Sequence, residues 1–212
     1  MKQLFIMMGL LLGLGVPSFT TTITYSTSGT LTCTGCGGNG TGTVTTGTSP
    51  NTATIQFLGL ASSSVCAGII GNNDCATNAS FGDFLSSALG GGAAFTGGTF
   101  TLTLTQTAPS PTGDSPATFQ ADFSGTITPT TNGVTVLFNG ANQSRTITAV
   151  LGSTTYSLPS FVLLVPQTTN GGDTTLQGLV SYDAASEIPE PISMVLLGSG
   201  IAGILLGRRR WQ

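Results

Sequence analysis

Alternation of apolar and hydroxyl-bearing residues is the feature of this chain that most restricts its fold. Between Thr99 and Thr105, threonines alternate with three apolar residues, Phe100, Leu102 and Leu104. The segment Thr118–Thr128 alternates in a similar way. Side chains of a β-strand point to opposite faces in turn, so this period of two predicts sheets with one buried face. Threonine suits the exposed positions because its restricted χ1 fits a pleated surface.

The same pattern predicts strands along most of the chain. The other expected strands are Thr22–Tyr25, Thr30–Cys33, Thr52–Leu58, Val134–Phe138, Arg145–Val150, Phe161–Val165 and Leu176–Tyr182. Turn sequences such as Asn132-Gly133 lie between them. This spacing predicts an all-β body, an antiparallel β-sandwich or jelly-roll-like fold. Phe161–Val165 is apolar at every position, which predicts a central strand covered on both faces.

One segment predicts a helix instead. Five apolar residues recur with the spacing of one helical face, namely Phe81, Phe84, Leu85, Ala88 and Leu89. Ser80 is a suitable N-cap, and the three glycines at positions 90–92 would end the helix. We therefore expect one short helix that covers an end of the sandwich.

The N-terminal residues have the organisation of a secretory signal peptide. Lys2 gives a positive start, Leu4–Val16 is an apolar run, and Pro17 interrupts it. The run is short for a spanning helix, which needs about 20 apolar residues. Residues 1–20 are therefore expected to be a signal peptide, with signal peptidase and the secretion machinery as partners. A retained N-terminal anchor is the alternative, and both send the following residues across the membrane.

The C-terminal residues combine three features in a fixed order. The first is a motif held extended by its prolines, Pro189, Glu190 and Pro191. The second is the uncharged run Ile192–Gly207, which would extend about 24 Å as a transmembrane helix, slightly less than a hydrocarbon core of about 30 Å. The third is a basic cluster that would hold the C-terminus on the cytoplasmic side, Arg208, Arg209 and Arg210.

This arrangement closely resembles the PEP-CTERM sorting signal of bacterial exported proteins. The resemblance covers residues 187–212 and rests on the Pro-Glu-Pro motif, the glycine-rich apolar run and the arginine cluster. It implies recognition by an exosortase, a membrane-embedded enzyme that cuts near the motif and releases or transfers the exported part. The family usually has Val before the motif, where this chain has Ile188. An ordinary C-terminal membrane anchor is the alternative.

Residues 21–186, between the two signals, are expected to form one domain with very few cations. Arg145 is its only basic residue, and the seven acids up to Glu187 give residues 21–187 a net charge of −6. A surface so short of cations cannot bind nucleic acid by neutralising its phosphates, which excludes nucleic acid as a partner. Thr and Ser make up more than a quarter of the chain, so solubility depends on hydroxyl groups. Such a surface suits an extracellular, carbohydrate-rich setting.

Side chains for catalysis are scarce in this domain. It contains no His and no Lys, so the Ser-His-Asp, Cys-His and Ser-Lys arrangements of nucleophilic enzymes cannot form. Paired carboxylates for glycoside hydrolysis remain an alternative among Asp74, Asp83, Asp114, Asp122, Asp173 and Asp183. Most of these acids are more simply read as solvated turn residues. The sequence therefore predicts a protein that is not an enzyme and uses no cofactor.

Four cysteines fall in two close pairs, Cys33 with Cys36 and Cys66 with Cys75. Local disulfides within each pair are the simplest of the three pairings that four cysteines allow in an oxidising compartment. A redox or zinc site at Cys33–Cys36 is the alternative, although a thioredoxin-like site needs a βαβ setting and zinc usually takes two Cys-x-x-Cys knuckles. Unpaired thiols are the third reading.

Loop residues leave two further alternatives open. Residues 72–74 and 170–173 offer oxygen ligands for Ca²⁺, but turns use the same Asn, Gly and Asp residues, and no metal site is predicted. Three triplets fit the N-glycosylation pattern, at Asn39, Asn78 and Asn142, and such triplets also arise by chance in a Thr-rich chain.

These observations predict an exported, non-enzymatic protein of the cell surface or extracellular matrix. The C-terminal helix would anchor it transiently in the inner membrane, and extracellular polysaccharide would be a partner. A carbohydrate-binding or adhesin module is the alternative. That function would need exposed aromatic rings for sugars to stack on, and the candidates are Tyr25, Tyr156 and Tyr182.

Overall fold

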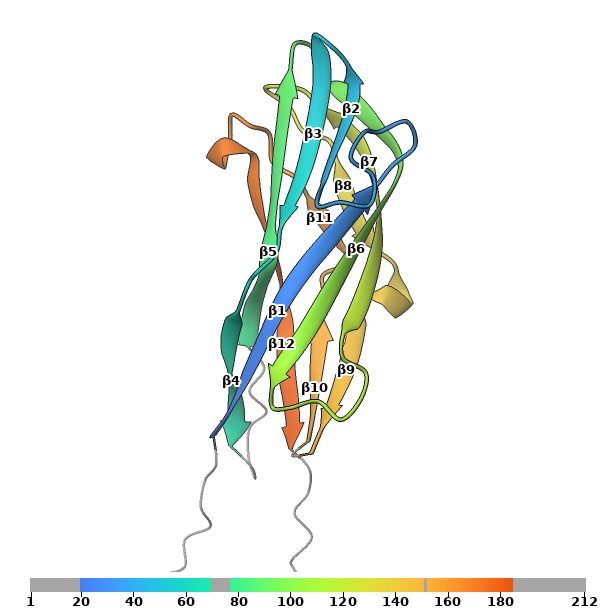
Figure 1. Cartoon of the computed structure of the whole chain (residues 1–212). Coiled ribbons are helices and arrows are strands. Elements are labelled where there is room, and N and C mark those ends of the chain that lie inside the picture. Colours follow the sequence, from blue (N-terminus) through green and yellow to red (C-terminus); the bar gives the residue numbers. More distant parts are fainter. Residues whose placement is uncertain (1–19, 70–76, 151, 185–212) are drawn as a thin grey trace, which may run out of the picture.

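The computed structural model describes residues 20–69, 77–150 and 152–184. In these residues twelve strands form two six-stranded antiparallel sheets that enclose one hydrophobic core (Figure 1). The predicted all-β antiparallel body is thereby confirmed. The predicted signal peptide over residues 1–20 and the sorting segment over 187–212 lie outside the described residues, apart from the backbone of Thr20.

The first sheet has the strand order β11-β8-β7-β6-β1-β4. Its strands are β1 (Thr20–Thr32), β4 (Ser63–Ile69), β6 (Ala93–Ala108), β7 (Ala117–Ile127), β8 (Thr135–Phe138) and β11 (Phe161–Leu163). The longest strands, β1, β6 and β7, lie beside one another, so the centre of this sheet is also its most extensively paired part.

The second sheet has the strand order β2-β3-β5-β12-β10-β9. Its strands are β2 (Thr43–Thr48), β3 (Asn51–Leu58), β5 (Thr77–Leu89), β9 (Ser144–Ala149), β10 (Gly152–Ser157) and β12 (Asp173–Ala184). Two single 3-10 turns, η2 (Gly140–Asn142) and η3 (Asn170–Gly172), are the helical elements of the described residues. Of the strands, β2, β4, β5 and β10 were not predicted as strands.

The period-two prediction is confirmed in β6 and β7. Phe100 and Leu102 of β6 are fully buried and pair with Ala121 and Phe119 of β7, which are also buried. The residues between them, such as Thr101, lie on the outer face. Burying one face of each strand therefore accounts for the alternation in the sequence.

Strand β1 is one continuous strand where the sequence predicts two, Thr22–Tyr25 and Thr30–Cys33. Gly29 lies in the middle of it, paired with Leu102 of β6. A Cβ at this position would lie 2.4 Å from the Phe57 ring and 2.7 Å from the Phe100 ring. Glycine is therefore used here because two rings pack directly on the strand backbone, and it does not mark a turn.

The predicted helix over residues 81–89 is wrong, because this segment is part of strand β5. Its register against β12 shifts between the pairs Asp83–Thr175 and Ser80–Gln177, which leaves one extra residue in β5. Gly82, with φ +122°, lies in this β-bulge. The extra residue places Phe81 and Phe84, three positions apart, on the same buried face, which imitates helical spacing. A helical face would also have buried Leu89, which is 69% exposed.

The prediction of a central, doubly covered strand at Phe161–Val165 is also wrong. Strand β11 lies at the edge of the first sheet and pairs only with β8 within the described residues. Val162 and Leu164 are buried, whereas Phe161 and Leu163 are more than half exposed. The continuous apolar sequence therefore reflects a strand with apolar residues on a solvent-exposed face as well as on its core face.

The core contains two groups of aromatic rings that join the sheets. Phe57 and Phe84 of the second sheet meet Phe100 of the first, with ring centroids 4.8–5.0 Å apart. Three further rings form the second group, with centroids 5.6–6.3 Å apart, namely Tyr25 of the first sheet and Phe81 and Tyr156 of the second. Offset and edge-on pairs at these distances each add about 0.5–1.5 kcal/mol beyond their burial.

The two ends of the described chain lie at the same end of the elongated body. Strand β1 begins there and β12 ends there, whereas the loop that follows β1 lies toward the other end (Figure 1). The segments that precede and follow the sandwich in the sequence are therefore attached to one end of it.

Candidate functional site

A disulfide closes the loop at the end of β1, as predicted for the first cysteine pair. Cys33 and Cys36 are bonded with their Cα atoms 5.4 Å apart. Cys33 is buried and Cys36 is half-buried. Cys75 and the side chain of Cys66 lie outside the described residues, so the second disulfide stays a prediction.

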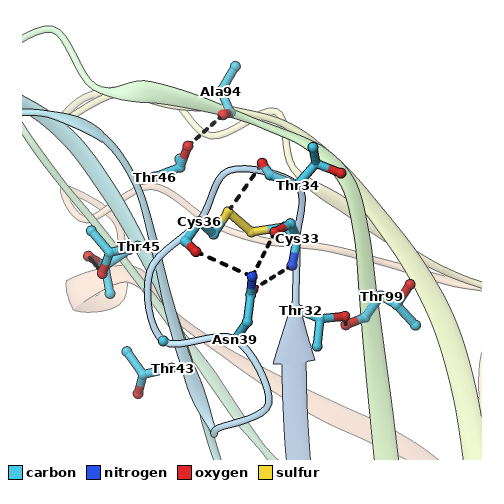
Figure 2. Close-up of a disulfide and its surroundings, with 12 residues drawn as sticks. Thr32, Cys33, Thr34, Cys36, Asn39, Thr43, Thr45, Thr46, Ala94 and Thr99 are labelled. Carbon is cyan, nitrogen blue, oxygen red and sulfur yellow. Dashed lines mark hydrogen bonds between the residues drawn. A yellow bond between two sulfur atoms is a disulfide. The ribbon is translucent and has the colours of Figure 1, made fainter.

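Asn39 holds the disulfide loop in place. Its amide nitrogen donates to the carbonyl oxygens of Cys33 (3.0 Å) and Cys36 (3.3 Å), and its Oδ1 accepts from the Cys33 N–H (2.8 Å). Figure 2 shows the Asn39 amide between the two half-cystines. One side chain thus satisfies three backbone groups of a loop that has no strand partner for them.

The setting of the disulfide is a connection between antiparallel strands. The loop folds back so that Thr41 bridges to Leu31 of β1 and Gly37 bridges to Thr45 of β2. This differs from the βαβ setting that a thioredoxin-like site requires. The arrangement favours the structural reading of Cys33–Cys36 over the redox reading.

The three tyrosines considered for sugar stacking are buried. Tyr25 and Tyr156 are fully buried and Tyr182 is 4% exposed. The Tyr25 hydroxyl donates to the Ser80 carbonyl (2.7 Å), and the Tyr156 hydroxyl donates to Gln106 Oε1 (2.9 Å). Burial raises the pKa of both Tyr25 and Tyr156 above the ordinary tyrosine value. None of these three candidates can therefore form the exposed platform that a carbohydrate-binding module would need, because all three lie in the sandwich interior.

Arg145, the one basic residue between the two terminal signals, binds the loop before β9. Its guanidinium donates to the backbone carbonyls of Thr118, Ala141 and Ser144 and to Asn142 Oδ1. It also lies 5.6 Å from the centroid of the buried Phe119 ring. These contacts fix η2 and β9 against β7, which is a structural use of the charge.

The candidate carboxylates are spread over different parts of the fold. Asp122 lies on the outer face of β7 and accepts from the Asn139 amide (3.3 Å). Asp83 lies on β5 between β3 and β12, and Asp183 lies near the end of β12. Asp114 has φ +60° in an exposed turn. Within the described residues no three His, Cys, Asp or Glu side chains form a group that could hold a metal ion. Asp74 lies outside them.

The 170–173 segment forms a turn that is anchored to β5. Asn170 Nδ2 donates to the Asp173 carbonyl (3.3 Å), and Gly171 has φ +65° within η3. Ser86, buried on β5, donates to the carbonyls of Val165 (2.6 Å) and Gly172 (3.3 Å). The candidate Ca²⁺ ligands of residues 170–173 thus form a tight turn, while the 72–74 segment lies outside the described residues.

The three glycosylation triplets differ in how free their asparagines are. Asn39 is occupied by the disulfide loop, and Asn142 accepts a hydrogen bond from Arg145 (3.0 Å). Asn78 is exposed at the start of β5. Modification of the Asn39 amide nitrogen would therefore remove a hydrogen bond to the disulfide loop.

Hydroxyl groups predominate on the outer face of the first sheet where β1, β6 and β7 lie side by side. Cross-strand rows run from β1 through β6 to β7 in register, and two of them are Ser28–Thr103–Thr118 and Thr30–Thr101–Gln120. Adjacent strands are about 4.8 Å apart, so the hydroxyls form a regular two-dimensional array. This face offers mainly uncharged hydrogen-bonding groups, with Asp122 as a carboxylate on β7, and it agrees with the threonine alternation in the sequence.

The comparisons with known proteins concern the C-terminus. No curated protein and no solved structure matches this chain. The model of the PEP-CTERM protein-sorting motif matches residues 187–210, which contain the Pro-Glu-Pro motif, the apolar run and the arginines. Among the described residues no helix is long and apolar enough to cross a membrane, and the predicted helix over 192–207 lies outside them.

The match confirms the resemblance found in the sequence. Pro189, Glu190 and Pro191 lie near the start of the matched segment, and the arginines of the basic cluster, Arg208, Arg209 and Arg210, end it. Such a motif implies export, a membrane-anchored sorting signal and processing by an exosortase. The chain carries a PEP-CTERM protein-sorting motif, which implies an exported protein that is sorted by an exosortase.

Proposed function

We propose that this protein is a non-enzymatic component of the cell surface or extracellular matrix. The sandwich is the delivered part, and the exosortase separates it from its membrane signal near Pro189–Pro191. The observation that carries the proposal is the sorting motif at residues 187–210, placed directly after the last strand of a folded body. The signal peptide at residues 1–20 starts the same export route.

The position of the motif limits where the enzyme acts. Strand β12 ends at Ala184, five residues before Pro189. Five residues of fully extended chain span at most about 18 Å. The cleavage region is therefore held close to the end of the sandwich, the end at which β1 also begins (Figure 1). The loop that carries the disulfide lies toward the opposite end of the body from the end of β12 (Figure 1).

The chemistry of the body supports a non-catalytic role. The side chains with distinctive chemistry, Arg145, Tyr156 and Ser86, are bound to backbone or buried amide groups that hold the fold together. On the outer face of β1, β6 and β7, the body presents the hydroxyl array to its surroundings. Hydroxyl groups exchange hydrogen bonds readily with hydrated polysaccharide, which supports the extracellular polysaccharide as the surroundings of the delivered protein.

The experiment follows the full chain, with an epitope tag in the exposed turn at Gly113, in cells with and without the exosortase. Intact mass is measured for protein recovered from membranes, from washed cell surfaces and from the extracellular polysaccharide fraction. In cells with the exosortase, we expect the protein to lack the mass of the residues after the cleavage site and to be recovered mainly outside the membrane fraction. Without it, we expect the uncut mass in the membrane fraction.

A pair of variants makes the test specific. Replacing both prolines (Pro189→Ala with Pro191→Ala) should give the uncut, membrane-bound form even when the enzyme is present, whereas Ser186→Ala should be processed like the unaltered chain. If the protein has the same mass and location with and without the enzyme, the proposed processing is contradicted. A processed protein found only in the free medium, absent from the surface and polysaccharide fractions, would remove the matrix assignment and leave the sorting assignment intact.

A further inference from the structure

The β11 edge of the first sheet is unusual because its exposed side chains are apolar. Phe161 is 58% exposed, Leu163 is 55% exposed, and Leu137 on the neighbouring strand β8 is 45% exposed. Phe161 and Leu137 are directly paired across the two strands, so their side chains lie on the same outer face. We call these three residues the β11 patch.

The backbone of β11 is also open to a partner strand. The Phe138 N–H of β8 donates to the Ser160 carbonyl (2.9 Å). The Leu164 N–H donates to the carbonyl of Val134, the residue before β8 (3.0 Å). In an antiparallel ladder the hydrogen-bonded positions alternate, so Val162 also faces β8. The N–H and C=O groups of Phe161 and Leu163 therefore point away from β8, where the described part of the chain places no other strand.

The other edges of the two sheets are more polar where they are described. Strand β2 exposes threonines and buries Val44, and β9 exposes Ser144, Thr146 and Thr148. Strand β4 presents Ser63 and Ser64 in its described portion. Polar or charged residues on an edge discourage pairing with another chain, and β11 lacks them.

We propose that β11 pairs with β11 of a second copy of this chain, antiparallel and about a two-fold axis at Val162. In that register Phe161 of each copy lies opposite Leu163 of the other. Each of these two pairs exchanges both backbone hydrogen bonds, so the four outward donors and four outward acceptors of the two copies meet in four hydrogen bonds. The same patch meets itself, as a closed two-fold dimer requires. The two six-stranded sheets become one continuous sheet.

The side chains and charges around β11 are compatible with this pairing. Phe161 of each copy would contact Leu163 of the other copy and Leu137 of the same copy. The exposed edges of the two Phe161 rings would then be covered by apolar atoms. The nearest carboxylate in the same row is Asp122, which pairs with Leu137. Two Asp122 residues in the dimer would be five strand spacings apart, about 24 Å, which exceeds the screening length of about 8 Å at physiological salt. Like charges therefore do not oppose the dimer.

The size of the patch sets the strength of the dimer. Three side chains that are about half exposed offer roughly 300 Å² of apolar surface per copy. Stable complexes bury more than about 1,200 Å² in total, so this dimer belongs to the weak, transient class. It forms where copies are concentrated, as they are on a surface to which every copy is delivered by the same signal.

The test uses the full chain in a mild detergent, with sedimentation equilibrium over a range of protein concentrations. The double variant Phe161→Thr/Leu163→Thr gives β11 the residue that the outer face carries elsewhere. We expect the dimer dissociation constant to rise at least tenfold. The matched control, Leu89→Thr/Leu179→Thr, removes two exposed leucines from the second sheet and should change it by less than twofold. Thermal unfolding of each variant confirms that the fold is retained.

Amide hydrogen exchange provides a second measurement at single-residue level. The Phe161 and Leu163 amides should exchange quickly in dilute protein and become protected at high concentration. The Val162 amide, already bonded to β8, should be protected in both conditions. An unaltered dissociation constant in the Phe161→Thr/Leu163→Thr variant, or a monomer at every concentration, would overturn the proposal. Association that persists equally in that variant would assign self-association to another part of the chain.

Discussion

Strands β7 and β5 contribute the same kind of buried face to the core in two different ways. In β7, Phe119, Ala121 and Phe123 are buried at strict intervals of two. In β5 the buried rings Phe81 and Phe84 are three positions apart, because Gly82 adds one residue to the strand. Both strands obey the rule that one face is buried. The difference is a single inserted residue, and it is enough to make a strand resemble a helix in sequence.

The bulge has a structural consequence that β7 lacks. On the C-terminal side of Gly82, Phe84 packs with Phe57 and Phe100, and on the other side Phe81 packs with Tyr25 and Tyr156. Strand β5 therefore contributes one ring to each aromatic group. In β7, by contrast, Phe123 packs against Phe95 of the neighbouring strand β6. The irregular strand is thus the one that links both parts of the core.

The largest expected effect tests whether residues 81–89 form part of strand β5 or the helix that their sequence predicts. Phe84→Ala should lower the free energy of unfolding by about 3–5 kcal/mol, because it leaves a cavity between the sheets. Leu89→Ala should lower it by less than about 0.5 kcal/mol, because that side chain is mostly in solvent. Urea denaturation measures both. Similar losses for the two variants would support the helical face and contradict the strand.

The next effect tests the bulge itself. Gly82→Val should lower the free energy of unfolding by about 3 kcal/mol, since φ +122° is unfavourable for any other residue and a Cβ would lie 2.5 Å from the Leu58 carbonyl oxygen. Gly113→Ala is the control, because nothing lies within 4 Å of the Cβ position there. The shift in the urea midpoint is the measurement. If both variants behave alike, the bulge is not a constraint on β5.

The smallest effect concerns the two tyrosines that pack against Phe81 of β5, Tyr25 and Tyr156. The ring contact of β7 is between Phe123 and Phe95, which do not titrate. Burial raises the pKa of Tyr25 and Tyr156, so the folded state keeps protons that the unfolded chain releases near pH 10. The contribution of these tyrosines to the free energy of unfolding should be constant below pH 10. Above pH 10 it should fall, by up to about 1.4 kcal/mol per pH unit for each tyrosine. Denaturation at pH 9–11 measures the slope. Tyr156→Phe should make the fall shallower, and an unchanged slope would refute the assignment.

Several errors in the sequence interpretation have the same physical origin. The residues of β1 are predicted as two separate strands on either side of Gly29, Gly82 lies within a helical pattern, and the three tyrosines are the candidates for sugar stacking. In each case the deciding contact comes from a distant segment, such as Phe57 and Phe100 against Gly29 or Gln106 against Tyr156. Local sequence carries no information about a ring that arrives from another sheet. The β11 edge was misread because apolar content cannot distinguish a covered strand from an exposed one.

The sequence by itself determined where this protein is sent and what kind of fold is delivered. The sorting motif consists of contiguous residues, 187–210, and the alternation of β6 and β7 is a local consequence of burying one face of a strand. Tertiary structure alone decided which strands meet, where β5 bulges, that the tyrosines are interior, and that β11 lies at an edge with Phe161 exposed. These features depend on contacts between residues far apart in the chain, and no local pattern records them.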